Sequence, residues 1–242
     1  MSSFAASSAL ENRLLSALPF EIYQKLAAHL EPVMLSPQQI LHPIGEGIAY
    51  VYFPIRSLVS LTTLLSNGSM LEVGLVGRNG FVGASVVLGR RESVQQAIVQ
   101  VGDSAFRLPI EQLLIEFEQS PALQSLLLEY VQVLLLQTSQ LAACHRFHHI
   151  RERLARQLLL IQSALSIDEF TLTHEALAQM LGTRRSGVTV AIGELTQLGA
   201  IQCSRGRISI VQPQVLESIS CECFAVIREE RNRFNYRHPR SR

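Results

Sequence analysis

The sequence has no tryptophan, and its 242 residues include only four cysteines, at positions 144, 203, 221 and 223. Such sparse and unevenly spaced cysteines do not form a disulfide framework, so we expect a reducing compartment, the cytoplasm. The first eight residues lack the basic and apolar stretches of a secretory signal. The most apolar run, residues 126–136, contains Glu129 and Gln132 and is shorter than the roughly 20 apolar residues of a spanning helix. We therefore expect no membrane segment and no membrane partner.

The net charge of +1 is unevenly distributed along the chain. Residues 1–120 carry 7 basic and 10 acidic side chains, whereas residues 121–242 carry 14 and 10. A basic C-terminal half suits contact with phosphate groups, although a solvated surface can have the same modest excess. The length and the 48% hydrophobic content are sufficient for two domains of ordinary size.

The predicted secondary structure changes character along the chain. Apolar residues at helical spacing predict two short helices over residues 11–30, separated at Pro19. Short β-rich runs punctuated by glycine and proline then predict a small jelly-roll, a double-stranded β-helix. Pro109 and Pro121 each introduce a helix, and the second helix is expected to reach about His148. The β-rich runs lie between residues 33 and 107 and include residues 50–53, 58–65, 71–76 and 97–101.

The helix after Pro121 has apolar residues alternately four and three positions apart, the spacing of a coiled-coil seam. The seam residues, which we predict to form a dimer interface, are Leu123, Leu127, Tyr130, Leu134, Gln137 and Leu141. Further leucines would let another side pack on the β-roll. The alternative is a buried core helix of a monomer, and we favour the dimer because DNA readers with one recognition helix usually bind two half-sites.

Residues 171–211 have the pattern of a winged helix-turn-helix. Thr173 is a good N-cap for a first helix, Gly182 supplies a tight turn, and Thr183 is expected to cap the second helix. Residues 201–211 then predict a hairpin, the wing, with Arg205 and Arg207 at its turn. The residues predicted to contact DNA are Thr173, Thr183, Arg184, Arg185, Ser186, Thr189, Arg205 and Arg207. Arginine can read guanine in the major groove, and hydroxyl groups can reach bases or phosphates.

The order of β-roll, long helix and winged helix resembles the Crp/Fnr family of bacterial transcription regulators over nearly the whole chain. The stretches that carry the resemblance are residues 51–54, 72–83, 153–159, 172–182, 184–189 and 205–210. The resemblance implies an α+β fold with a sensor domain over residues 1–120, a dimerisation helix and hinge over 121–150, and a DNA-binding domain over 151–242. It also implies that Arg185 is the principal base-reading residue. The family usually has glutamate at the position of Ser186 and arginine at that of Val190, so its usual half-site does not carry over.

The β-roll departs from the cyclic AMP receptors that it resembles. In those proteins a Gly-Glu pair and an Arg-Ser or Arg-Thr pair hold the ribose and the phosphate, whereas the aligned positions here are Gly83-Ala84 and Gln95-Gln96. A buried phosphate without a cationic partner is costly. We therefore take Gly83, Ala84, Gln95 and Gln96 as a divergent effector pocket that does not bind cyclic AMP tightly. Arg90 and Arg91 could substitute for the missing arginine, but a solvated pair in a loop is the simpler interpretation.

Cysteine and histidine residues suggest a second possible input. Cys144 with His148, and His145 with His149, are one helical turn apart and could ligate a transition metal. Cys221 and Cys223 are expected in a final helix, where residues two apart point in different directions. A polar helix end beside the hinge is the simpler alternative, so the main prediction includes no metal site and no cofactor. A metal- or thiol-responsive regulator is kept as the alternative function.

Two other functions compete with that of a DNA-binding regulator: an enzyme and a protein scaffold. A cupin-like metal enzyme would need converging histidines, but residues 33–107 contain only His42, so we expect no catalytic residues and no enzymatic activity. A scaffold would show no salt-dependent DNA affinity. The expected partners are double-stranded DNA, a second copy of the chain and RNA polymerase, with an unidentified small-molecule effector where one exists.

Overall fold

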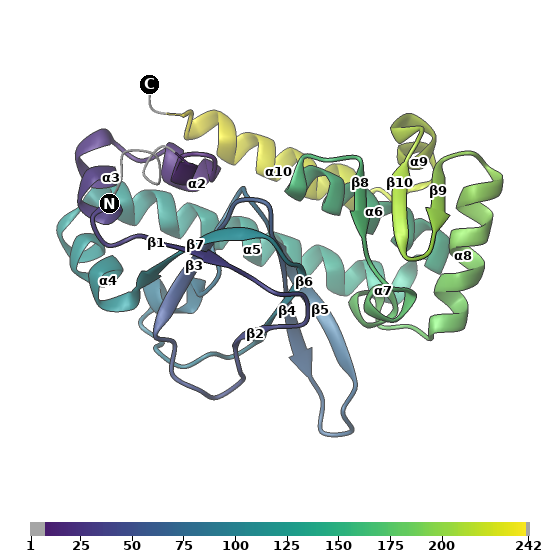
Figure 1. The fold of residues 1–242 in the computed structure, drawn as a ribbon, viewed down its shortest axis with the longest axis horizontal. Coiled ribbons are helices and arrows are strands. Elements are labelled where there is room, and N and C mark those ends of the chain that lie inside the picture. Colours follow the sequence, from purple (N-terminus) through teal and green to yellow (C-terminus); the bar gives the residue numbers. More distant parts are fainter. Residues whose placement is uncertain (1–7, 241–242) are drawn as a thin grey trace.

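The structure, a computed structural model, describes residues 8–240 and has an α+β fold in the predicted order (Figure 1). Two short helices, α2 (Arg13–Ser16) and α3 (Phe20–Ala27), precede the β-roll. Asn12 caps α2 by accepting hydrogen bonds from the backbone nitrogens of Leu14 and Leu15. Its amide also donates to the carbonyls of Pro54 and Gly80, so this fully buried side chain joins the N-terminal helices to the β-roll.

The β-roll consists of two antiparallel sheets, ordered β1-β7-β3 and β2-β6-β4-β5. Its strands are β1 (Glu31–Met34), β2 (Ile40–His42), β3 (Tyr50–Pro54), β4 (Leu58–Leu64), β5 (Met70–Val76), β6 (Gln96–Val101) and β7 (Ser104–Pro109), with the 3-10 helix η1 (Ala84–Leu88) after β5. The four predicted runs correspond to β3, β4, β5 and β6. Strands β1, β2 and β7 also lie in or overlap residues 33–107, which were predicted to be β-rich, but no individual run was named for them. β1 is exposed along most of its length, and β2 has only three residues.

Helix α4 (Ile110–Gln119) leads into the long helix α5 (Pro121–Phe147), as predicted. The Ser120 hydroxyl accepts from the backbone nitrogen of Leu123, and Pro121 occupies the first turn, where no N–H is needed. Among the described helices, α5 has the length and composition of a membrane span, with a mean hydropathy of 1.2 over 18 residues. One side of this helix is nevertheless packed into two hydrophobic cores of the same chain.

The predicted dimer seam requires a correction, because its residues are occupied within one chain. Leu123, Leu127, Tyr130, Gln137 and Leu141 are all buried, and Leu134 is partly buried. The first three pack into the core of the β-roll, and the C-terminal helix α10 (Cys223–Arg237) runs antiparallel along the rest of this side. The β-roll and α10 together cover this side of α5 within one chain, which the sequence pattern did not show.

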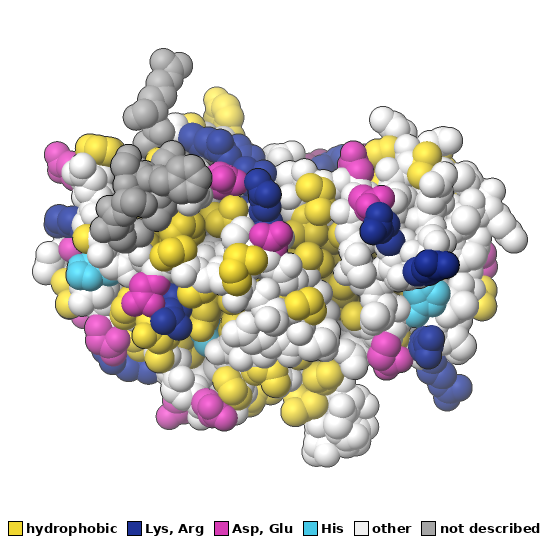
Figure 2. Space-filling view, in the orientation of Figure 1, with side chains coloured by type: hydrophobic (Ala, Val, Ile, Leu, Met, Phe, Trp, Pro, Cys, Tyr) yellow, Lys and Arg dark blue, Asp and Glu magenta, His cyan; other side chains and the backbone are white. Residues whose placement is uncertain are grey.

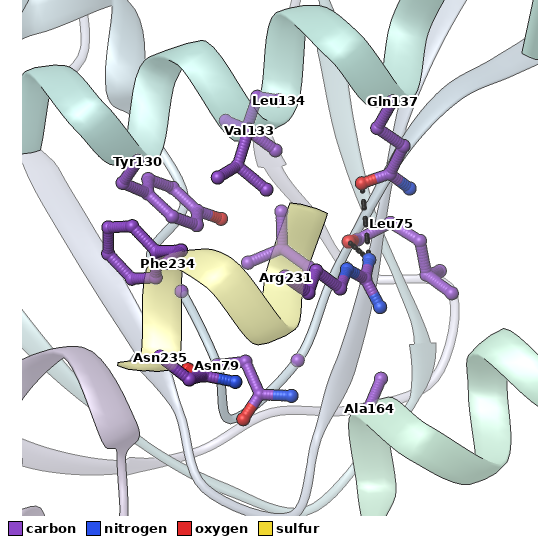
Figure 3. A pocket seen from close by; sticks show the side chains of 13 residues that line it. Leu75, Asn79, Tyr130, Val133, Leu134, Gln137, Ala164, Arg231, Phe234 and Asn235 are labelled. Atoms are coloured by element: carbon purple, nitrogen blue, oxygen red, sulfur yellow. Dashed lines mark hydrogen bonds between the residues drawn. The ribbon is translucent and has the colours of Figure 1, made fainter. Parts of the chain in front are cut away.

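Figure 3 shows how α10 is held on α5. The Arg231 guanidinium donates to the Leu75 carbonyl at 3.2 Å and to Oε1 of Gln137 at 3.1 Å. The Phe234 and Tyr130 rings lie 6.1 Å apart between centroids. These contacts place the C-terminal half of α10 beside the β-roll rather than beside the winged helix.

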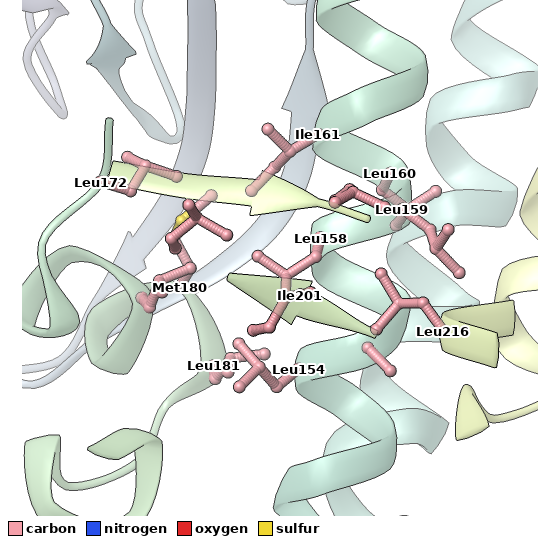
Figure 4. Packing of buried hydrophobic residues seen from close by; sticks show 14 of the residues in the cluster. Leu154, Leu158, Leu159, Leu160, Ile161, Leu172, Met180, Leu181, Ile201 and Leu216 are labelled. Atoms are coloured by element: carbon pink, nitrogen blue, oxygen red, sulfur yellow. The ribbon is translucent and has the colours of Figure 1, made fainter. Parts of the chain in front are cut away.

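The C-terminal region packs in a hydrophobic cluster around α6 (Ile150–Leu165), shown in Figure 4, which also includes Leu58, Leu75 and Leu141 of the preceding elements. Its other elements are β8 (Glu169–Thr171), α7 (His174–Leu181), α8 (Arg185–Gln197), β9 (Ile201–Ser204), β10 (Arg207–Ile210) and α9 (Pro213–Ile219). Leu154, Leu158 and Ile161 of α6 are fully buried against residues of the helix pair and the hairpin. The strand order is β8-β10-β9, so the wing has a third strand that the sequence pattern did not reveal.

Candidate nucleic-acid interface

Helices α7 and α8 and the turn between them have helix-turn-helix geometry. The Thr173 hydroxyl caps α7 by accepting from the Ala176 nitrogen at 3.0 Å, as predicted. Gly182 ends α7 with a φ of +56°, a left-handed conformation that favours glycine. The predicted capping role of Thr183 is wrong: α8 begins one residue later, and Arg184 occupies the N-cap position without a side-chain cap.

Helix α8 buries one face and exposes the other. Val188, Ala191, Ile192 and Leu195 are buried in the cluster around α6. The side chains of the opposite face that were predicted to contact DNA, Arg184, Arg185, Ser186 and Thr189, are all exposed. The structure therefore brings these four predicted residues together on one open surface.

The structure adds His174 to this surface, which the sequence pattern did not single out. Its Nδ1 lies 2.9 Å from the Thr189 hydroxyl, which donates its only proton to the Arg185 carbonyl at 3.1 Å. This contact joins the start of α7 to the exposed face of α8 and orients the Thr189 hydroxyl.

The wing is a tight hairpin, as predicted. Arg205 and Gly206 both have positive φ, +50° and +80°, which is the two-residue turn that suits the twist of paired strands. Arg205 is exposed, and Arg207 is also exposed but forms an ion pair with Glu169 on β8, with Nη1 3.2 Å from Oε1. Figure 2 shows basic side chains standing out over this C-terminal part of the molecule.

Comparison with known proteins relates this arrangement to a known DNA-binding domain. Residues 152–219 match the model of the Crp-like helix-turn-helix domain. The global nitrogen regulator of Synechocystis sp. is 24% identical over 208 residues, which are 81% of this chain and 92% of the relative. Residues 152–219 therefore form a Crp-like helix-turn-helix domain, and the chain as a whole is similar to Crp/Fnr transcription regulators.

Two solved structures show the same fold over most of the chain. FixK2 from Bradyrhizobium japonicum has a TM-score of 0.70 at 15% identity, and the match covers 79% of this chain and 98% of that protein. A putative Crp/Fnr regulator from Eubacterium rectale has a TM-score of 0.65 at 17% identity, with 86% and 98% covered. The family fold therefore includes the β-roll, although the family model matches only the C-terminal region.

In the β-roll, Gly83, Ala84 and Gln95 line a cavity of about 200 Å³ between the roll and α5. Gln96 does not line this cavity. It is the first residue of β6, and its carbonyl accepts a hydrogen bond from the Thr62 hydroxyl. His42 is the titratable side chain in the lining, and burial lowers its pKa. The described lining contains no arginine, lysine or carboxylate. Arg90 and Arg91 are exposed in the loop after η1, in agreement with their interpretation as a solvated pair.

A buried polar cluster joins the β-roll to α6. Glu72 on β5 is 1% exposed and accepts hydrogen bonds from the Ser60 hydroxyl and, at 2.8 Å, from Nε2 of Gln157. Burial raises the pKa of Glu72 to about 7, against the opposing hydrogen bonds and the charges of Arg156 and Arg231. Sequence reasoning missed Glu72 because a single glutamate in a β-rich run usually faces solvent.

The hairpin of β4 and β5 also contacts the helix-turn-helix directly. Its residues Leu65, Met70 and Leu71 line one side of an open cavity of about 870 Å³, and Thr183 and Arg184 line the other. A Cβ atom at Gly182 would lie 2.5 Å from Cδ1 of Leu71, so the turn between α7 and α8 fits closely against β5.

A group of cysteine and histidine side chains lies where α5 ends and α10 begins. Cys144, His148, Cys221 and Cys223 each place a potential ligand atom within 4.8 Å of the others. The predicted location of Cys221 in the final helix is wrong, since α10 begins at Cys223 and Cys221 lies in the turn before it. This turn lets both thiols face the same point, and hydrogen bonding with Cys221 lowers the pKa of Cys144.

The other predicted histidine pair is not part of this group. His145 Nδ1 lies 2.6 Å from the Arg153 guanidinium, and burial together with the charge of Arg153 lowers the pKa of His145 to about 4. His149 occupies the N-cap of α6, where its backbone nitrogen donates to Glu152. The two histidines therefore have separate structural roles.

Proposed function

We propose that this Crp/Fnr regulator binds double-stranded DNA as a cytoplasmic homodimer through α8 and the wing. The open face of α8 carries the proposal, because Arg184, Arg185 and Ser186 project from a helix whose other face is fully packed. A helix held in this way can enter a major groove with its N-terminal side chains on the base edges. We assign residues 1–120 to sensing, 121–150 to dimerisation and 151–242 to DNA binding.

The exposed residues take different roles in this proposal. Arg185 reads a base, while Arg205 and Arg207 on the wing contact phosphates, and Arg207 would exchange its ion pair with Glu169 for the DNA backbone. Thr173, Thr183, Arg184, Ser186 and Thr189 complete the contact surface. Val190, which is 62% exposed, presents an apolar group where the family usually has arginine, so we expect a different half-site.

The dimer is proposed to form on the outward side of α5. Leu128 and Leu135 are 45% and 57% exposed, and Val131 and Ala142 extend the same stripe at spacings of three, four and seven residues. This outward stripe (Leu128, Val131, Leu135 and Ala142) replaces the seam predicted from the sequence. Two copies related by a two-fold axis would bury these leucines and bring two α8 helices into position for two half-sites.

The effector is proposed to be a small molecule of low charge, distinct from cyclic AMP. The cavity between the β-roll and α5 offers polar groups such as Gln95 but no cation for a phosphate. Val131 and Leu135 line both this cavity and the outward stripe. Binding there would alter the dimer contact, and RNA polymerase is the expected downstream partner. We propose no catalytic activity for the chain.

The test is a selection of genomic fragments bound by the purified protein at near-physiological salt, with wild type and Arg185→Ala compared. We expect a two-fold symmetric motif with half-sites about one helical turn apart. Loss of specific affinity in the mutant should be roughly 1 to 3 kcal/mol. An equal loss on every sequence would make Arg185 a phosphate contact, and no enrichment in buffer or in cell extract would refute the DNA-binding proposal.

A further inference from the structure

Three thiols and one imidazole meet at the junction of α5, α10 and the preceding turn. The Cys144 and Cys221 sulfurs are 3.5 Å apart, and the Cys223 sulfur is 3.5 Å from Nδ1 of His148. All three cysteines are buried, and His148 is partly buried. Cys144 and His148 are more than 70 residues from Cys221 and Cys223 in the sequence. The cluster is therefore formed by the tertiary fold and not by neighbouring residues in the chain.

These separations match those of ligands around a single zinc ion. With Zn–S bonds of about 2.3 Å and a Zn–N bond of about 2.0 to 2.1 Å, tetrahedral geometry separates neighbouring ligand atoms by roughly 3.5 to 3.8 Å. A disulfide bond, by contrast, needs two sulfurs at about 2.0 Å and leaves the third thiol and the histidine without a role. The four-atom set is therefore better suited to a metal ion.

The groups around the cluster are those that support metal ligands. His148 directs Nδ1 toward the sulfurs while its Nε2 lies 3.2 Å from the Glu222 carboxylate. A carboxylate on the far nitrogen fixes the tautomer that leaves the near nitrogen free to ligate. Nε2 of Gln140 donates to the Cys223 sulfur at 3.2 Å, which stabilises a thiolate.

A buried cation also faces the cluster. Arg156 is fully buried, and its Nε and Nη1 atoms have no hydrogen-bond partner among the described residues. Its positive charge favours the thiolate forms of Cys144 and Cys221. One divalent ion with three thiolates and a neutral histidine has a net charge of -1, which would compensate Arg156.

We propose that Cys144, His148, Cys221 and Cys223 bind one Zn²⁺ ion, which fastens the start of α10 to the end of α5. Binding releases the protons of the three thiols, and no redox step is involved. All four ligand positions are filled by protein, so the site is structural rather than catalytic. Since His148 is the C-cap of α5 and α6 begins two residues later, at Ile150, the ion also fixes the hinge between the long helix and the winged helix.

The first experiment measures metal on the full-length protein after dialysis against a weak chelator. We expect one zinc per chain in wild type and in Cys203→Ser, which alters the cysteine outside the cluster. The Cys221→Ser, Cys223→Ser double variant should contain almost none. Equal zinc in that variant and in wild type would overturn the site, and so would a wild type without zinc or with a Cys144–Cys221 disulfide under reducing purification.

Cobalt replacement keeps the test independent of whether a variant folds. Co²⁺ added to the zinc-free wild type should give the visible bands of a tetrahedral ion and a near-ultraviolet band from thiolate-to-metal charge transfer. Cys203→Ser should give the same spectrum, and an octahedral spectrum without thiolate bands in wild type would refute thiolate ligation. Neither measurement involves DNA, so failure of the metal site and failure of DNA binding are separable outcomes.

The carboxylate beside His148 gives a graded test. Glu222→Gln should weaken zinc binding roughly 10- to 100-fold, as measured by competition with a chromogenic chelator, because the histidine loses its orienting partner. Glu229→Gln changes an exposed glutamate on the same helix and should leave the zinc affinity unchanged. Equal affinities of the two variants would show that Glu222 does not support a ligand.

Discussion

Helices α5 and α8 each bury one face in the chain and leave the other face open, but the open faces differ in chemistry. That of α5 carries Leu128 and Leu135, whereas that of α8 carries Arg185, Ser186 and Thr189. An exposed apolar stripe is suited to another protein surface, and exposed arginines and hydroxyls on a fixed helix are suited to DNA. The chemistry of the open side, more than the helical periodicity, indicates the partner.

The outward stripe of α5 can be broken by one charge. In Leu135→Asp a two-fold interface would bury two carboxylates in an apolar contact, so the dimer dissociation constant should rise by about three orders of magnitude or more, roughly 4 kcal/mol. Analytical ultracentrifugation measures the change. Ile115→Asp, at a comparably exposed position on α4, is the control and should stay dimeric. If both variants dimerise like wild type, the stripe is not the interface.

Substitutions on the inner face of α5 should lower the stability of the folded chain instead of weakening the dimer. Leu127 is fully buried, so Leu127→Ala should lower the free energy of unfolding by about 2 to 5 kcal/mol. Its neighbour Leu128 is 45% exposed, and Leu128→Ala should cost under about 1 kcal/mol. Urea titration of both variants in the Leu135→Asp background removes the dimer contribution. Equal costs would mean that the two faces are not distinguished by packing.

The buried Glu72, which is bonded to Gln157 of α6, should make the stability of the protein depend on pH. Its pKa of about 7 lies above that of an ordinary glutamate, so the folded chain keeps its proton where the unfolded chain has lost it. The contribution of Glu72 to the free energy of unfolding is therefore fully present below about pH 4.5, and it is lost as the pH rises through 7. The charges that face Glu72 come from Arg156 on α6 and Arg231 on α10.

Between about pH 5 and about pH 8, wild type should lose about 2 to 3 kcal/mol of unfolding free energy relative to Glu72→Gln. Urea titrations at several pH values measure this difference. Glu46→Gln, at an exposed position, should follow wild type. A constant difference between wild type and Glu72→Gln across this range would show that Glu72 titrates normally.

The smallest expected effect concerns the wing. Arg205→Ala should weaken binding to all DNA sequences by about 1 kcal/mol and reduce the slope of log affinity against log salt by about 1, because one phosphate contact is lost. Fluorescence anisotropy over a salt series measures both quantities. Arg90→Ala removes an exposed arginine of the β-roll and should change neither. A sequence-selective loss in Arg205→Ala would instead assign the wing to base recognition.

The order of the elements and the helix-turn-helix were predictable from sequence because their signals are local. Pro121 after Ser120, Gly182 with positive φ, and the Arg205-Gly206 turn act through their immediate neighbours. The buried side of α5 was not predictable, because Phe234 and Arg231 reach it from about 100 residues away. The same holds for the metal cluster, since neither the Cys144–His148 pair nor the Cys221–Cys223 pair shows its partner in the sequence.

The return of α10 along α5 has a consequence for biosynthesis. Phe234, Arg231 and Cys223, which pack on Tyr130, Gln137 and Cys144, are synthesised long after the helix that they cover. The β-roll can collapse early, but one side of α5 stays uncovered until α10 has been made. A nascent chain therefore exposes both sides of α5, and a chain that lacks α10 is damaged at the β-roll and the long helix as well as at its own end.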